Sequence, residues 1–168
     1  LLQYRQASGT LNRKVVHQKL KDMLNATSEP PKRLRALWAL YVTDGLTENR
    51  LYELLNDADE HVRAWSIQFL CDVSESNAFQ PERNADWVLE PDVLEKLAAM
   101  AQDDPSQVVR LYLASAVQRL PFAQRWSILQ GLISHAEDVS DNNLPRMYWF
   151  ALEPMVPEYQ SCLLYTSD

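Results

Sequence analysis

The sequence predicts an all-α protein in which about four helical hairpins stack as an α-solenoid, or α-α superhelix. Apolar residues recur at helical spacing along most of the 168 residues, and the chain contains only three glycines. An acidic residue also precedes an arginine by six positions at three places, and an apolar helix is predicted after each. These pairs are Glu29 with Arg35, Asp57 with Arg63, and Asp104 with Arg110. A spacing that returns three times indicates an internal repeat.

The first predicted hairpin spans residues 11–43 and follows a polar lead-in, residues 1–10. Its first helix is predicted to end near Ala26 and carries one apolar stripe: Val16, Leu20, Met23 and Leu24. The Pro30-Pro31 pair is tolerated only in a first helical turn, so the second helix is expected to begin there and to reach Val42. Gly45 suits the left-handed position that ends a helix.

The second predicted hairpin spans residues 46–72. Thr47 is a candidate N-cap for a short helix that carries Leu51, Leu54 and Leu55 on one face. The second helix, residues 57–71, has two apolar stripes, so we expect it to be packed on more than one side.

Residues 73–89 are polar and interrupt the pattern, so we interpret them as an insertion. The third hairpin is predicted at 90–120, with Asp104 as the cap of its second helix and Pro105 as the first helical residue. The fourth is predicted at 122–157. Residues 158–168 show neither the helical period nor the acid-to-arginine spacing, and we interpret this tail as a sequence artefact that is foreign to the repeat.

The recurring acid and arginine have a physical role in such a repeat. A carboxylate at a helix start can accept backbone N–H groups, and an arginine further along can reach an acid or a carbonyl of its own or the neighbouring hairpin. We therefore predict a structural ladder formed by Glu29, Arg35, Asp57, Arg63, Asp104 and Arg110. The alternative is that these are ordinary surface ion pairs, each contributing less than about 1 kcal/mol.

Composition argues against several classes of function. The net charge of −7 and a pI near 5.0 oppose binding of nucleic acid, which needs clustered basic residues. No apolar run is long enough to span a bilayer. Two cysteines, Cys71 and Cys162, make neither a disulfide framework nor a metal cluster. Because the sequence begins at Leu1, we expect it to be a fragment of a longer protein.

Residues that could act in catalysis or ligand binding are also explained by structural roles, such as helix capping or core packing. His17, His61 and His135 are isolated, so no metal site is predicted. Carboxylates that could act as acid and base, Glu90, Asp92, Glu95, Asp103 and Asp104, stand where helix caps are expected. The tryptophans Trp38, Trp65, Trp126 and Trp149 lie on apolar stripes and are predicted to be in the core. Trp87, in the insertion, remains a candidate contact residue.

Four segments carry a resemblance to a known family. They are Leu34–Leu46, Asp59–Trp65, Val109–Ala116 and Asn143–Pro154. The acid, the Val-Arg pair and the Ala-rich helix resemble HEAT repeats. More specifically, these segments are similar to the HEAT-repeat region of the large haem-binding, membrane-bound dehydrogenase-like proteins of planctomycetes and verrucomicrobia. The similarity covers roughly residues 11–157.

The resemblance implies a parent protein with a sugar-dehydrogenase-like β-propeller, a HEAT-repeat middle region and a C-terminal cytochrome c-type domain, located outside the cytoplasm. This chain has no Cys-x-x-Cys-His sequence for haem attachment, so haem c is expected only in the C-terminal region of the parent. No catalytic, cofactor-binding or metal-binding residue is expected in this segment.

The function expected from these features is that of a non-catalytic scaffold or spacer. Its partners would be the flanking domains of the same chain or another protein. One alternative is a segment that contacts a ligand or substrate of the dehydrogenase, with Trp87 reaching a neighbouring site. A freestanding HEAT adaptor that binds other proteins is a further alternative.

Overall fold

A computed structural model describes residues 12–26, 29–72 and 88–156. These residues form eight α-helices, two short 3-10 segments and no β-strand, which confirms the predicted all-α class. The lead-in, most of the predicted insertion with Trp87, and the tail 158–168 lie outside the described residues. The elements are α2 (Arg13–Ala26), α3 (Pro30–Val42), α4 (Glu48–Leu54), α5 (Glu60–Leu70), α6 (Pro91–Asp103), α7 (Gln107–Val117), α8 (Phe122–Ile133), η1 (Ala136–Ser140), α9 (Leu144–Leu152) and η2 (Glu153–Met155).

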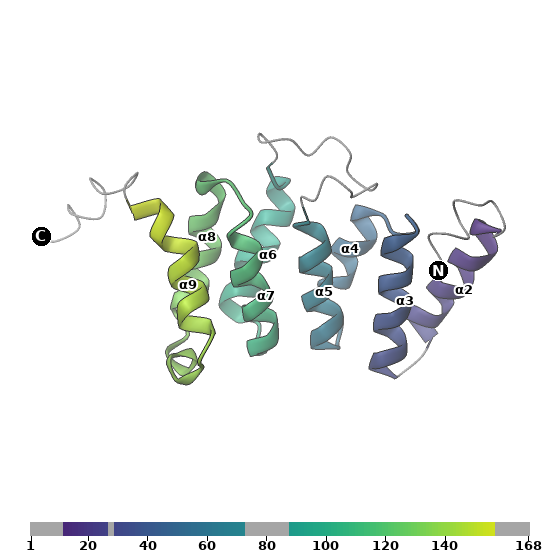
Figure 1. Cartoon of the computed structure of the whole chain (residues 1–168), viewed down its shortest axis with the longest axis horizontal. Helices are drawn as coiled ribbons and strands as arrows, with labels where there is room; N and C mark the ends of the chain where they lie inside the picture. The colour runs from purple at the N-terminus through teal and green to yellow at the C-terminus, as the bar shows by residue number, and fades with distance from the viewer. Residues whose placement is uncertain (1–11, 27–28, 73–87, 157–168) are drawn as a thin grey trace, which may run out of the picture. The chain divides into compact units, whose positions relative to one another are not determined.

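The helices fall into two compact units, one containing α2–α5 and the other α6–α9. In the first unit α2 packs on α3, α4 packs on α5, and α3 also contacts α5 (Figure 1). In the second unit α6 packs most extensively on α8, and α7 packs on α9. In the first unit the most extensive contacts therefore join helices that are consecutive in the sequence, whereas in the second unit they join alternate helices.

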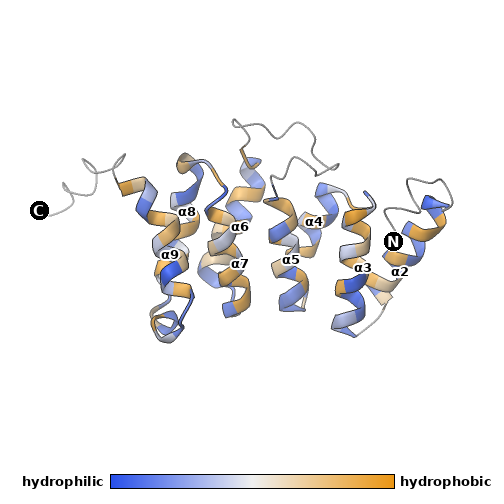
Figure 2. Cartoon of the chain, viewed as in Figure 1, coloured by the Kyte–Doolittle hydropathy of each residue, from blue (hydrophilic) through white to orange (hydrophobic). Residues whose placement is uncertain are grey.

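Amphipathic helices build the core of each unit. Hydrophobic and hydrophilic residues alternate along the helices (Figure 2), as expected where one face of a helix is buried. The side chains buried in the first unit include Leu24, Leu37, Leu40, Leu51, Leu54, Val62, Ile67 and Leu70. Those buried in the second unit include Val93, Leu97, Val109, Leu113, Ile128, Leu132, Leu144 and Ala151.

The connection between α3 and α4 confirms one predicted helix boundary and corrects another. Thr47 is the N-cap of α4, and its hydroxyl accepts a hydrogen bond from the Arg50 backbone N–H at 3.2 Å. The left-handed residue after α3 is Asp44, with φ of 56°, and not Gly45. Gly45 is required for space instead, because a Cβ atom there would lie 2.8 Å from Leu40 Cδ2.

The start of α7 also differs from the prediction. Helix α7 begins at Gln107, and Ser106 is its N-cap, with its hydroxyl accepting the Val109 N–H at 3.3 Å. Asp104 ends α6, and its carboxylate accepts the Ser106 N–H at 3.0 Å. A serine hydroxyl can accept the first-turn N–H groups as well as a carboxylate can, and Ser106 is the residue directly before the first turn of α7.

The prediction that four tryptophans lie in the core is wrong for three of them. Trp38, Trp126 and Trp149 expose 39%, 46% and 50% of their surface, and Trp65 is half-buried. A helical stripe of apolar residues is wider than the face that a neighbouring helix covers, so the large rings at its edge stay at the surface.

Close approach of α6 and α8 depends on Gly131. A Cβ atom at this position would lie 2.9 Å from the carbonyl carbon of Ala101 and 2.9 Å from the backbone nitrogen of Gln102. Glycine in a helix interior is otherwise unfavourable by roughly 0.8–1.0 kcal/mol relative to alanine. The glycine is therefore explained by the packing of the two helices.

We predict that Gly131→Ala lowers the free energy of unfolding by about 1–3 kcal/mol, because the added methyl group meets backbone atoms that cannot move away. Urea unfolding of the 168-residue chain, followed by circular dichroism, would measure this. Gln130→Ala, at the exposed neighbouring position of α8, should have little effect. A stabilising effect of Gly131→Ala would contradict the packing explanation.

Candidate functional site

Three arginines occupy the same position in their helices. Arg33, Arg63 and Arg110 are each the fourth residue, of α3, α5 and α7 respectively. Each guanidinium donates a hydrogen bond to a backbone carbonyl that precedes its own helix: in the last turn of α2, in the connection between α4 and α5, and at the C-cap of α6. The bonds run from Arg33 Nε to Leu24 O at 2.9 Å, from Arg63 Nη1 to Asp57 O at 2.9 Å, and from Arg110 Nη1 to Asp104 O at 3.0 Å.

These contacts have a common physical reason. The last carbonyl groups of a helix have no partner within the helix and carry a partial negative charge. A guanidinium placed in the first turns of the following helix supplies N–H donors and a positive charge at that point. Arg33 and Arg110 thus tie α3 and α7 to the end of the helix before them, and Arg63 ties α5 to the connection that precedes it.

In the first unit Arg33 also binds the connection before α5. Its Nη1 donates to Asp57 Oδ1 at 2.9 Å, and its Nη2 pairs with Asp57 Oδ2. Both side chains are largely buried, with 16% and 13% exposed. The Asp59 N–H donates to Asp57 Oδ1 at 2.9 Å as well. One carboxylate therefore connects α3 to the start of α5.

In the second unit Arg110 makes the corresponding connection to Asp138, which lies in η1 before α9. Arg110 Nε donates to Asp138 Oδ2 at 2.7 Å, and Nη2 donates to Oδ1 at 2.5 Å. The Tyr148 hydroxyl donates to Oδ2 at 2.6 Å, and Gln107 Nε2 donates to Oδ1 at 3.1 Å. Arg110 and Asp138 expose only 2% and 1% of their surface, so this ion pair is buried and both oxygens of the carboxylate are occupied.

The pKa values reflect this environment. Burial by itself would raise the pKa of Asp138, but hydrogen bonds from Arg110, Tyr148 and Gln107 outweigh it and lower the pKa to about 2. Burial and the hydrogen bond to Asp138 raise the pKa of Tyr148. In the first unit burial by itself would raise the pKa of Asp57, but the hydrogen bond from Arg33 outweighs this effect, and the pKa of Asp57 is lowered. Both carboxylates are held in the charged form.

Two of the three predicted acid and arginine pairs are in contact, and the third is not. Asp57 and Arg63 are brought together, as are Asp104 and Arg110, in both cases through the backbone carbonyl of the acid. Glu29 and Arg35 are not brought together. The Glu29 carboxylate pairs with Lys32 Nζ at 2.7 Å, and Arg35 is exposed.

Sequence reasoning missed Arg33 and Asp138. A signal for Arg33 was present, because Pro30 marks the first residue of α3 and places Arg33 fourth, as Arg63 and Arg110 are in their helices. The distance from arginine to acid is 24 residues for Arg33 and Asp57 but 28 for Arg110 and Asp138. Connections of different length thus hid Asp138 from a search for fixed spacing.

Arg125 is a buried arginine of a different kind. Its donors meet three backbone carbonyls, from Nε to Leu120 O at 2.8 Å, Nη2 to Gln118 O at 2.8 Å and Nη1 to Ala151 O at 3.2 Å. The guanidinium carbon also lies 4.6 Å from the centre of the Phe122 ring. Burial lowers the pKa of Arg125. Its side chain joins the ends of α7 and α9 to α8.

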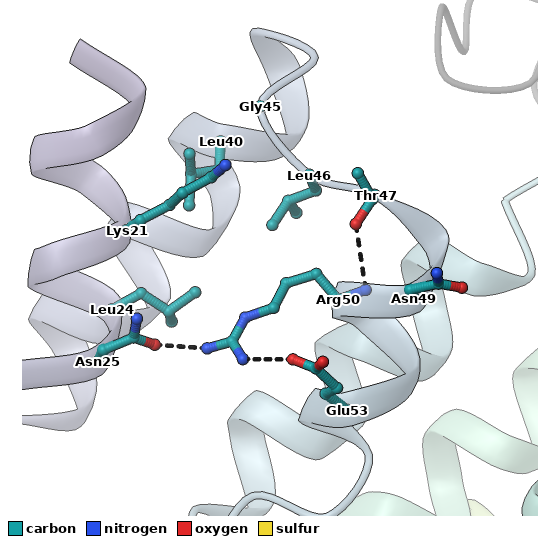
Figure 3. Close-up of a pocket in the computed structure, with 10 residues that line it drawn as sticks. All are labelled: Lys21, Leu24, Asn25, Leu40, Gly45, Leu46, Thr47, Asn49, Arg50 and Glu53. Atoms are coloured by element: carbon teal, nitrogen blue, oxygen red, sulfur yellow. Dashed lines mark hydrogen bonds and ion pairs between the residues drawn. The ribbon is translucent and has the colours of Figure 1, made fainter. Parts of the chain in front are cut away.

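A hollow of about 250 Å³ lies between α2 and the segment from α3 to α4 (Figure 3). Arg50 crosses it from α4. Its guanidinium pairs with Asn25 Oδ1 on α2 and donates to Glu53 Oε2 at 2.6 Å. Lys21 extends over Leu40 at the opposite wall (Figure 3). The hollow is thus bridged by an arginine whose charge is already balanced.

A second hollow, of about 260 Å³, lies in the other unit beside η1 and α9. Its walls include the exposed apolar side chains of Ile133, Val139 and Trp149. Its polar groups are engaged within the protein, since Asp138 and Tyr148 bind each other and His135 Nε2 lies 2.9 Å from Ala101 O. The surface offered to solvent there is apolar.

The described residues contain no group of three or more His, Cys, Asp and Glu residues that could hold a metal ion. The histidine His17 has a partner within the protein. Its Nε2 donates to the Thr43 hydroxyl at 3.1 Å, because that hydroxyl gives its proton to Ala39 O.

Over the same described ranges, no helix has the length and apolarity needed to cross a membrane.

No family model, curated protein or solved structure matches the chain. The roles assigned to Arg33, Arg63, Arg110 and their acids therefore rest on the contacts that these residues make.

We predict that Arg110→Met lowers the free energy of unfolding by about 3–5 kcal/mol, because it leaves the Asp138 carboxylate buried without its cation. The double variant Arg110→Met with Asp138→Asn should recover part of this loss. Arg35→Met, a matched change at an exposed arginine, should cost less than about 0.5 kcal/mol. Urea unfolding would compare them, and equal losses for Arg110→Met and Arg35→Met would contradict the role assigned to Arg110.

The lowered pKa of Asp138 predicts a loss of stability in acid. Its folded-state pKa, about 2, lies below the ordinary value of 3.8, so the ion pair contributes fully above about pH 4 and its contribution disappears as the pH falls toward 2. The expected contribution is on the order of 2 kcal/mol. The free energy of unfolding, measured from about pH 5 to pH 2, should decrease less steeply for Asp138→Asn than for the native chain. For Asp22→Asn, a change at an exposed acid of α2, it should decrease as steeply as for the native chain.

Proposed function

We propose that this chain is a non-catalytic scaffold segment of the HEAT type. The observation that carries the proposal is the similarity of Arg33, Arg63 and Arg110, each fourth in its helix and each bonded to a backbone carbonyl that precedes that helix. Three equivalent contacts are expected of a repeated structural unit, because each unit must solve the same packing problem.

Burial at equivalent positions also supports a repeat. The residues three, four and seven positions after each arginine are all buried. They are Ala36, Leu37 and Leu40 in α3, Ser66, Ile67 and Leu70 in α5, and Leu113, Ala114 and Val117 in α7. In α9, Met147 takes the place of the arginine, so the fourth hairpin is the degenerate copy.

The proposed arrangement is an α-solenoid of about four hairpins. Within each unit a carboxylate in the connection of the second hairpin binds an arginine of the first, Asp57 to Arg33 and Asp138 to Arg110. An ion pair that joins one hairpin to the next would define the distance and angle between them, which is what a scaffold requires.

The parent protein that we propose follows from the family resemblance. In it this segment would be the spacer between a sugar-dehydrogenase-like β-propeller and a cytochrome c-type domain outside the cytoplasm. The haem would be bound by that other domain, and the partners of this segment would be the flanking domains or another protein. The internal use of Asp57, Asp138 and their arginines is consistent with a structural role and not a chemical one.

Determining the coding sequence on both sides of this segment tests the proposal. We expect β-propeller repeats upstream and a Cys-x-x-Cys-His sequence downstream, which would place the segment between two redox domains. Further helical repeats with neither of these would instead indicate a HEAT adaptor that binds other proteins. A catalytic domain continuous with α9 would contradict the spacer.

A further inference from the structure

One stripe of α3 is exposed although it is largely apolar. We define the α3 stripe as Arg35, Trp38 and Val42, which follow one another at helical spacing on the same side of the helix. Trp38 and Val42 expose 39% and 43% of their surface. Trp38 and Val42 are separated by about one helical turn, so their exposed surfaces adjoin.

The α3 stripe continues into an aromatic cluster shared with α5. The ring centres of Trp38 and Trp65 lie 5.1 Å apart at 72°, which places the two indoles nearly edge to face. Trp65 contacts Phe69, with ring centres 5.4 Å apart, and Phe69 stacks on Tyr41 at 3.8 Å. Because these rings hold one another, the corner between Trp38 and Trp65 is preformed.

Arg35 gives the α3 stripe an unbalanced positive charge. It forms no hydrogen bond or ion pair within the described residues, whereas Arg33 on the same helix is paired with Asp57. Asp59, which lies close enough to Arg33 to raise its pKa, is engaged at the start of α5, where its carboxylate accepts the N–H groups of His61 and Val62. Arginine and tryptophan are also the residues that most often carry the binding energy of protein interfaces.

We propose that the α3 stripe binds an acidic peptide segment that carries aliphatic side chains. A carboxylate of the segment pairs with Arg35, and an aliphatic side chain two residues away lies in the corner between Trp38 and Trp65. Arg35 and Trp38 are separated by about 4.5 Å along the helix. Side chains two residues apart in an extended peptide point the same way and are about 6.6 Å apart, a difference that the long Arg35 side chain can span. This inference names a partner for the scaffold and rests on that function, but not on the identity of the parent protein.

The test uses the peptide acetyl-Glu-Ser-Leu-Ser-amide, which in an extended conformation places the acid and the leucine on one side, and the 168-residue chain labelled with ¹⁵N. We expect the indole N–H resonances of Trp38 and Trp65 to shift on titration, while that of Trp126, which is also exposed, on α8, stays in place. Acetyl-Gln-Ser-Leu-Ser-amide, which lacks the charge, and acetyl-Glu-Ser-Ser-Ser-amide, which lacks the aliphatic group, should each bind about tenfold more weakly.

Variants separate binding from folding. Arg35 is exposed and holds no other group among the residues that the structure describes, so Arg35→Gln should weaken binding about tenfold and leave the rest of the spectrum unchanged. Trp38→Ala should abolish the shift at Trp65, and Arg146→Gln, a matched exposed arginine on α9, should have no effect. The proposal is overturned if the Trp38 and Trp65 resonances do not move, or if Arg35→Gln binds as the native chain does. Either result would leave the coding-sequence test of the scaffold function unaffected.

Discussion

The buried pair of Arg110 and Asp138 is the interaction on which the second unit depends. Removing two charges from water is costly, and the attraction between them compensates only when the remaining donors and acceptors are satisfied. Here Tyr148 and Gln107 donate hydrogen bonds to the Asp138 carboxylate, and the Asp104 carbonyl accepts a hydrogen bond from the Arg110 guanidinium. The pair therefore connects α6, α7, η1 and α9 through one buried network.

The first unit uses the same device with less burial. Arg33 binds the end of α2 and the connection before α5, but its pair with Asp57 retains some exposure. The units also differ in how their first helices meet. Gly131 lets α6 and α8 approach at backbone distance, whereas a hollow bridged by Arg50 remains between α2 and α4.

Most charged groups with buried partners are used to join helices. Arg33, Arg63, Arg110 and Arg125 all bind backbone carbonyls near helix ends, and the acids paired with Arg33 and Arg110 are held in the charged form. A general acid or base needs a pKa near the working pH and access to a substrate. The buried carboxylate of Asp138 has neither, which agrees with a structural role. The α3 stripe differs because its arginine and tryptophan face solvent.

The sequence by itself determined the helical class, the positions of most helices and the presence of arginines that recur before apolar helices, because these depend on local spacing and on proline and threonine at helix starts. Which arginine acts in α3, and which acid it meets, was decided only by the tertiary structure. Arg33 and Arg35 are both near the start of α3, but only Arg33 faces the neighbouring helix. Asp138 is distant from Arg110 in sequence, and connections of unequal length hide such pairs. The tertiary structure likewise left Trp38 at the surface, since burial depends on which neighbour covers a stripe and not on the stripe alone.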